Sequence, residues 1–142
     1  MRSDLGLLLH RAEGDSFWAL PGGRVDIGEE ASTAVVREIH EELGETVQCG
    51  RLVWIVENFF VLGAEPHHEV GMYFEVSVRP DSKLLTRCGP FRGREAERSL
   101  EFAWFLPQDI IQLDIRPSFL KKEIFQDAFS FKHVVHRDEG IS

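Results

Sequence analysis

The sequence predicts a mixed α/β domain, because short strand-like runs alternate with a smaller number of helical segments. Stretches rich in β-branched and aromatic residues lie at 51–62 and 69–78, and residues 29–43 show the one long helical pattern in the first half of the chain. The length of 142 residues is typical of one domain with a substantial core, and no repeat or linker interrupts it. We therefore expect a single domain over residues 1–142.

Two short strands and a sharp turn are expected at the beginning of the chain. Residues 5–10 (LGLLLH) and 17–20 (FWAL) are apolar runs of strand length, and the turn-like sequence AEGDS separates them. A proline and two glycines follow at 21–23 and predict a loop. The helix over 29–43 comes next, with Gly44 as a typical helix end.

The helix and the later strands complete the prediction. Ala31, Val35 and Ile39 are four residues apart, so they define the helix face that is expected to pack on the core. The loop GAEPHH (63–68) joins the strands at 51–62 and 69–78, which are expected to pair. A polar, basic segment, a strand, a helix and a last short strand follow at 79–98, 99–106, 117–129 and 131–137.

The net charge of −8 limits the possible partners. Nucleic acid and anionic membrane surfaces repel an acidic chain at long range, so we expect neither as a partner, and a cation would have to mediate any contact with phosphate. No apolar run approaches the roughly 18 residues of a membrane span, and the N-terminal apolar segment is too short for a signal peptide. Cys49 and Cys88 lack the spacing of a zinc site. These features predict a cytoplasmic protein with free thiols.

Residues 22–45 hold much of the negative charge, with seven carboxylates and two arginines. In a helix, Glu38, Glu41 and Glu42 would lie close together, where like charges repel, and two of them would be near the negative end of the helix dipole. A hard divalent cation such as Mg²⁺ or Mn²⁺ would remove this repulsion and could carry substrate phosphates. The cluster therefore suggests a metal site that binds a phosphate-containing ligand.

Neighbouring residues suit such a site. Arg37 can pair with Glu41 one turn later or reach back to Glu29, which would fix a ligand carboxylate in place. Gly22 and Gly23 allow a tight turn and a close approach of the backbone to a ligand. The alternative is a solvated, charge-rich helix face, which is common. An EF-hand, a P-loop, a GxGxxG motif and a GxSxG motif are all absent from the sequence.

The complete spacing favours the metal site. Gly23, five residues, Glu29, seven residues and then REIHEELG (37–44) resemble the Nudix box, G-x5-E-x7-R-E-U-x-E-E-x-G-U, in which U is a bulky aliphatic residue. The one departure is Glu45 at the final U position, which concerns packing rather than chemistry. The sequences WALPGGRVDIGE and EFAWFLPQDI are also similar to the family, so the resemblance covers roughly residues 5–115.

The resemblance implies a Nudix-like α/β/α sandwich around a mixed sheet, and the few residues before 5–10 suggest that this sheet could lack its first strand. It also implies hydrolysis of a nucleoside diphosphate linked to another moiety, with Mg²⁺ or Mn²⁺, by attack of water on phosphorus. By position, the resemblance makes Glu38, Glu41 and Glu42 metal ligands and catalytic carboxylates, Glu29 a supporting carboxylate and Arg37 the ion-pair partner of Glu29. We also expect Gly22, Gly23 and Arg24 to contact the substrate.

The general base and the class of function each have an alternative. Glu41 or Glu42 is the expected base within the motif, and Glu69 or Glu101, each at a predicted strand start, is the alternative outside it. A module that senses a nucleotide without cleaving it could also keep this fold. The intact set of carboxylates favours the enzyme, because a sensor could lose them without harm.

Other residues could contact the substrate but have common structural explanations. His67 and His68 lie in a predicted loop, where histidines are often only solvated. An open sheet edge would favour a homodimer, unless the C-terminal segment 131–137 covers that edge. Aromatic residues that could stack on a base or fill the core are Phe17, Trp18, Phe59, Phe60, Tyr73 and Trp104. Arginines that could meet phosphate or belong to a solvated loop are Arg87, Arg92, Arg94 and Arg98.

Overall fold

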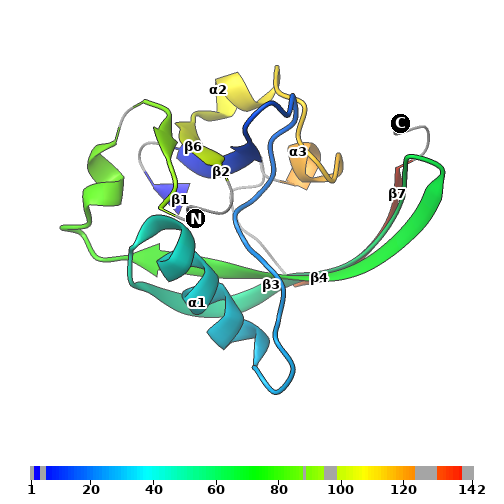
Figure 1. Ribbon diagram of the computed structural model, residues 1–142, viewed down its shortest axis with the longest axis horizontal. Helices are drawn as coiled ribbons and strands as arrows, with labels where there is room; N and C mark the ends of the chain where they lie inside the picture. The colour runs from blue at the N-terminus through cyan, green and yellow to red at the C-terminus, as the bar shows by residue number, and fades with distance from the viewer. Residues whose placement is uncertain (1, 4–5, 88, 95–98, 124–130, 139–142) are drawn as a thin grey trace.

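Along the chain, two short strands are followed by one long helix, a long β-hairpin and a final group of shorter elements (Figure 1). This computed structural model describes residues 2–3, 6–87, 89–94, 99–123 and 131–138. In chain order the elements are β1 (Arg2–Ser3), β2 (Gly6–Ala12), α1 (Ala31–Leu43), β3 (Val47–Leu62), β4 (Glu65–Val78), η1 (Lys83–Thr86), β5 (Phe91–Arg92), β6 (Leu100–Phe105), α2 (Pro107–Ile110), α3 (Leu120–Glu123) and β7 (Lys132–Asp138).

The described strands form two sheets. β1, β2, β6 and β5 make an antiparallel sheet, in which β2 and β6 pair from Leu7 opposite Phe105 to Ala12 opposite Leu100. β3 is the central strand of the second sheet, antiparallel to β4 and parallel to β7. The β3–β4 hairpin is long and curved, and β7 runs along its outer end (Figure 1). The predicted α/β class is confirmed, and the mixed strand pairing occurs in the second of the two sheets.

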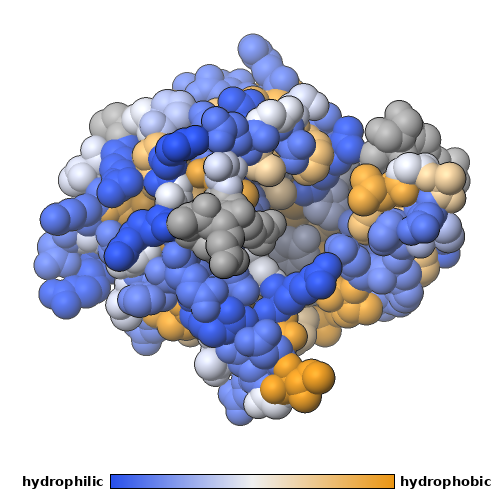
Figure 2. Space-filling model, in the orientation of Figure 1, coloured by the Kyte–Doolittle hydropathy of each residue, from blue (hydrophilic) through white to orange (hydrophobic). Residues whose placement is uncertain are grey.

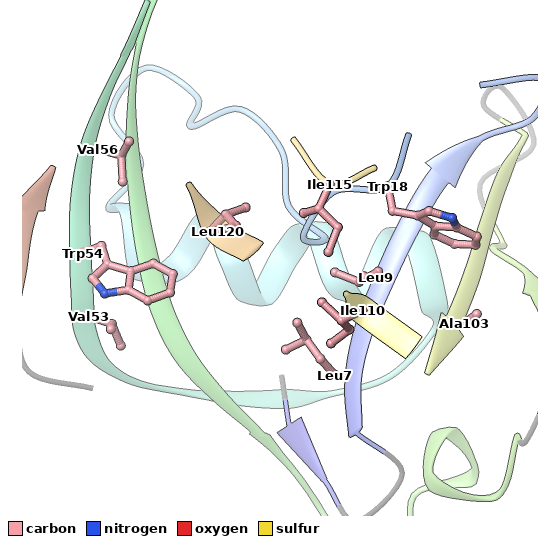
Figure 3. Close-up of a cluster of buried hydrophobic side chains, with 10 residues drawn as sticks. All are labelled: Leu7, Leu9, Trp18, Val53, Trp54, Val56, Ala103, Ile110, Ile115 and Leu120. Carbon is pink, nitrogen blue, oxygen red and sulfur yellow. The ribbon is translucent and has the colours of Figure 1, made fainter. Parts of the chain in front are cut away.

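β2 is buried on both faces, because its side chains alternate between two apolar clusters. Leu7 and Leu9 belong to the larger cluster, which also contains Trp54 of β3 (Figure 3). Leu8 belongs to the smaller cluster, together with Phe102 of β6. The continuous apolar run predicted as a strand at 5–10 is thus the sequence of a strand with packing on both sides.

The helix α1 begins two residues later than predicted and ends where predicted. Glu30 has an extended backbone (φ −71°, ψ 147°), so the helix begins at Ala31, and Gly44 ends it in the left-handed conformation (φ 70°). The buried side is rotated from the predicted stripe, of which only Ile39 is fully buried, and it includes a carboxylate. The buried positions of α1 are Ala34, Ile39 and Glu42.

The strand predicted at 17–20 is wrong. This segment makes only single bridges, one between Trp18 and Ile115 and one between Ala19 and His10. Its two bridges are to different segments of the chain, so neither extends into a ladder. Pro21, which follows, has no N–H group and cannot donate a ladder hydrogen bond. The loop predicted at 63–68 is also too long, because only residues 63 and 64 form the turn and β4 begins at Glu65.

The last strand is confirmed, but its partner differs from the one expected. β7 pairs with β3, whereas the edge beside β2 carries β1, so the predicted coverage of that edge by the C-terminal segment is wrong. The alternative, a homodimer, stays a prediction. Of the helix predicted at 117–129, the structure describes α3, and residues 124–130 lie outside the described ranges. Within those ranges, no helix has the length and apolar character needed to cross a membrane.

Candidate active site

The Arg37 guanidinium is the centre of the acidic cluster. The face of the molecule on which α1 lies in Figure 1 is largely hydrophilic in Figure 2. In the cluster, Arg37 is the hydrogen-bond donor. Its Nε and Nη2 donate to the two carboxylate oxygens of Glu29 at 2.8 and 3.0 Å. Its Nη1 donates to Glu38 Oε1 at 3.0 Å and to Glu41 Oε2 at 3.2 Å, and Nη2 also donates to the backbone oxygen of Arg24 at 3.0 Å. All five N–H groups are therefore directed at acceptors, an arrangement that the single ammonium of a lysine could not reproduce.

The same contacts hold the loop before α1. Glu29 accepts the backbone N–H of Asp26 at 3.1 Å, and Arg37 Nη2 lies 3.6 Å from Asp26 Oδ2. The hydrogen bond from Arg37, followed by the Asp26 amide, lowers the pKa of Glu29, and the Glu29 carboxylate in turn raises the pKa of Arg37. Gly28 provides a left-handed turn at φ 85°. An ion pair that stays charged at neutral pH thus ties residues 24–29 to the helix.

Glu38 lies against the glycine that begins the motif. Its side chain is only 13% exposed, and Arg37 occupies its Oε1. A β-carbon at Gly23 would overlap the Glu38 carboxylate, whereas one at Gly22 would meet nothing within 4 Å. Only the second glycine of the pair is thus required by a close contact. Within the described part of the chain, Glu38 Oε2 accepts no hydrogen bond, so one oxygen is available to a ligand.

Glu41 and Glu42 differ sharply in access to solvent. The Glu41 side chain is 46% exposed, whereas Glu42 is fully buried. The backbone oxygen of Glu42 accepts the N–H of Arg94 at 2.6 Å, and a β-carbon at Gly93 would lie 2.9 Å from that oxygen. The segment that follows β5 therefore docks on the C-terminal end of α1, which encloses this end of the acidic cluster.

The carboxylates fit a hard divalent cation in chemistry and proximity, but they do not form a finished coordination set. Among the described residues, no group of three or more His, Cys, Asp or Glu side chains is arranged to hold a metal ion. Glu38 and Glu41 nevertheless lie within 3.2 Å of the same Arg37 nitrogen. Oxygen donors in this arrangement suit Mg²⁺ or Mn²⁺. The ligand set Glu38, Glu41 and Glu42 stays a prediction.

The two alternative bases lie elsewhere. Glu101 is near the start of β6, as predicted, but it is paired with Arg11 at 3.0 Å, and the Arg11 guanidinium lies 4.5 Å from the Trp18 ring. Glu69 is an exposed residue in the interior of β4, opposite Asn58, rather than at a strand start. Of the four candidates, Glu41 combines solvent access with a place in the cluster.

His67 and His68 are in β4, so their predicted position in a loop is wrong. Each imidazole stacks on a phenylalanine of β3 with an interplanar angle of 8°, His68 on Phe59 at 4.1 Å and His67 on Phe60 at 5.1 Å. Arg137 of β7 lies 4.1 Å from the Phe59 ring centre. Cross-strand packing therefore explains both histidines without a ligand.

The other aromatic candidates are engaged in packing. Trp18 is in the larger core, and Tyr73 packs against that core. Trp104 packs against the smaller core and donates from Nε1 to the backbone oxygen of Leu84 at 3.1 Å. Phe17 lies beneath the Arg116 guanidinium at 4.8 Å. These contacts support the structural interpretation that the sequence left open.

The described arginines of the basic segment contact different parts of the molecule. Arg87 lies 4.9 Å from the Phe91 ring, and Arg92 pairs with Glu13 at 2.8 Å. Arg94 lies against Gly44 at the end of α1, where a cation complements the helix dipole. Arg98 lies outside the described residues.

Glu45, the departure from the motif, makes a polar contact where an aliphatic residue would pack. Its Oε2 accepts the Ser82 hydroxyl at 3.0 Å, and the Ser82 oxygen accepts the N–H of Leu84 at 3.2 Å. Ser82 is buried and forms the N-cap of η1. Glu45 thus links the end of α1 to the segment that follows β4. The sequence signalled this contact only as a mismatch at position 45.

The fold and the arginine-centred cluster define a Nudix-type domain. The chain matches the sequence model of the NUDIX domain over residues 2–127. It therefore belongs to the NUDIX domain family.

Two relatives and one solved structure illustrate the similarity. The chain is 28% identical to a MutT-like protein of Streptomyces ambofaciens over 112 residues, and this matching region covers 78% of this chain and 61% of that protein. It is 48% identical over 44 residues to an 8-oxo-(d)GTP phosphatase of Mycolicibacterium smegmatis, 31% of this chain and 13% of that one. The MutT protein of Methanosarcina mazei Go1 has a similar fold, with a TM-score of 0.57 at 22% identity over 82% of this chain and 78% of that one. The chain thus spans less than two thirds of either relative.

Proposed function

We propose that the protein hydrolyses the pyrophosphate bond of a nucleoside diphosphate linked to another moiety, with Mg²⁺ or Mn²⁺ as the cofactor. The convergence of Glu38 and Glu41 on one nitrogen of Arg37 carries this proposal, because it brings predicted ligands together at the surface of α1. Membership of the NUDIX domain family supports the reaction class. The name of the 8-oxo-(d)GTP phosphatase supports a nucleotide substrate.

The residues have distinct roles in this proposal. Glu38, Glu41 and Glu42 would hold the cation, which when bound offsets negative charge on the phosphate oxygens. Arg37 and Glu29 keep Glu38 and the preceding loop in position through their paired hydrogen bonds.

A water molecule attacks phosphorus, and its proton passes to a carboxylate. Glu41 is the candidate base, because it is the solvent-exposed carboxylate of the cluster, whereas Glu42 is buried and Glu101 pairs with Arg11 outside the cluster. The bridging oxygen leaves with the second phosphate group. Gly23 and Arg24 lie beside this cluster. Together with Gly22 they would approach the substrate phosphates with their backbone, and Arg24 also with its side chain.

Hydrolysis in ¹⁸O-labelled water tests the reaction. A panel of nucleoside triphosphates, nucleoside diphosphate sugars and dinucleoside polyphosphates should include a substrate that is turned over with Mg²⁺ or Mn²⁺ and not in excess chelator. The label should appear in a phosphate group of the product, while the sugar hydroxyls stay unlabelled. Label in a sugar hydroxyl would contradict the mechanism.

The alternative is a domain that senses a nucleotide without cleaving it. The accessible carboxylate of Glu41 and the available Glu38 Oε2 favour the enzyme, because a sensor has no need of them. Tight binding of one nucleotide by calorimetry, with no turnover of any member of the panel, would establish the sensor instead.

A further inference from the structure

Gly23 makes the closest approach of the loop to a predicted metal ligand. A β-carbon placed there would overlap the Cδ atom and both oxygens of Glu38. Gly23 is not among the glycines with positive φ, so its backbone conformation is open to other residues. What requires glycine at this position is therefore space for the carboxylate.

We propose that Gly23 is a positioning residue that sets the place of the Glu38 carboxylate and thereby the affinity of the site for a divalent cation. The inference rests on the proposed metal-dependent function and adds to it a residue that acts through Glu38. Arg37 fixes Oε1 by a hydrogen bond at 3.0 Å, and the bare α-carbon of Gly23 forms the adjacent wall. Between these two contacts, Oε2 is the oxygen that is left for a cation.

A methyl group at position 23 should displace the carboxylate and leave the fold intact. The three atoms nearest to the added β-carbon all belong to the end of the flexible Glu38 side chain. The Glu38 side chain can therefore rotate away at little cost in stability, but it cannot keep its position. Mutation of a residue that positions a metal ligand typically costs a factor of about 10 to 100 in metal affinity.

Gly89 is the control, because the proposed site does not include it and a β-carbon there would meet nothing within 4 Å. We would titrate Gly23→Ala, Gly89→Ala and the unmodified protein with Mn²⁺ and follow free Mn²⁺ by electron paramagnetic resonance. Gly23→Ala should raise the Kd for Mn²⁺ about 10- to 100-fold, and Gly89→Ala should change it less than about 2-fold. Melting temperatures in excess chelator should stay close together for all three proteins.

A double-mutant cycle with Glu38→Asp separates a direct contact from a general effect. The aspartate side chain is shorter by one methylene group and would clear the new methyl, so Glu38→Asp should cost less Mn²⁺ affinity in the Gly23→Ala background than alone. Equal costs in the two backgrounds, or unchanged Mn²⁺ binding by Gly23→Ala, would overturn the inference while leaving the proposed function intact. An unmodified protein that binds no Mn²⁺ and cleaves no nucleotide would overturn both.

Discussion

Arg37 and Glu29 are joined by two parallel hydrogen bonds, from Nε at 2.8 Å and from Nη2 at 3.0 Å. The two residues are eight positions apart, one in the loop and one on α1. Planar guanidinium and carboxylate groups match each other in this geometry, which makes the pair specific as well as strong. The remaining donors of Arg37 connect the pair to Glu38 and Glu41. This pair is therefore the element that joins the loop to the proposed ligands.

Arg37→Lys should lower the melting temperature at neutral pH and weaken Mn²⁺ binding, because one ammonium group cannot serve Glu29, Glu38 and the Arg24 carbonyl together. Arg79→Lys is the matched control, since Arg79 pairs with Asp81 at the surface, where the side chains are 79% and 72% exposed. Thermal unfolding and Mn²⁺ titration measure both effects. Equal behaviour of the two variants would show that the shared geometry at Arg37 is not needed.

Glu29 should make a contribution to stability that disappears in acid. Its pKa is lowered below the ordinary value of 4.5 by Arg37 first and by the Asp26 amide second. Because the folded state binds this proton less readily than the unfolded state, the contribution is present above pH 4.5 and is lost as the pH falls through the lower folded pKa. Denaturant titrations of the unmodified protein and of Glu29→Gln should therefore differ at pH 7 and converge in acid. A difference that does not depend on pH would contradict the assignment.

Tyr73 is the one tyrosine of the chain, so the absorbance of tyrosinate reports on it alone. Burial first, and the charge of Glu69 second, raise the pKa of Tyr73 to about 12. The folded state keeps this proton where the unfolded state loses it, so stability should fall as the pH rises from 10 towards 12. Glu69→Gln should lower the pKa but leave it above 10, because burial is the larger cause. Titration at the ordinary value of 10 in the folded protein would be the contrary result.

Glu45→Leu would restore the aliphatic residue of the motif, yet we expect it to destabilise this protein. It removes the acceptor of the Ser82 hydroxyl, and the loss of such a bond to a buried group costs about 1–2 kcal/mol. Glu45→Gln keeps an acceptor oxygen and should cost less. In the Ser82→Ala background, Glu45→Leu should have little effect, as a double-mutant cycle in urea would show. A gain in stability for Glu45→Leu alone would mean that packing outweighs this bond.

The motif spacing predicted α1, its end at Gly44 and both contacts of Arg37, because these depend on helix geometry and on positions close in sequence. The same local reasoning gave no indication that Glu42 is buried. Its burial depends on the segment that docks on the end of α1 through Arg94, far away in the sequence.

Strand boundaries failed for a similar reason. His67 and His68 follow a proline and a glutamate, which favour a loop locally, but each stacks on a phenylalanine of the opposite strand. Cross-strand contacts of this kind depend on register, and the register comes from a turn at only two residues, 63 and 64. The contact between Gly23 and Glu38 likewise requires the folded loop and cannot be read from spacing.

Glu41→Gln should lower kcat by a factor of about 10² to 10⁴ with a smaller effect on KM, because it removes a charge from the proposed ligand and base while keeping its size. Glu41 is exposed, so the variant should fold normally, and its melting temperature in chelator should remain close to that of the unmodified protein. Glu30→Gln is the control: Glu30 precedes the same helix, is exposed, makes no side-chain cap bond and lies outside the fixed positions of the motif.

Millimolar Mg²⁺ or Mn²⁺ should raise the melting temperature of the unmodified protein and of Glu30→Gln, since a ligand that binds only the folded state stabilises it. The same metal should raise the melting temperature of Glu41→Gln less. Equal losses of kcat in the two variants, or a full metal-induced shift in Glu41→Gln, would remove Glu41 from the site.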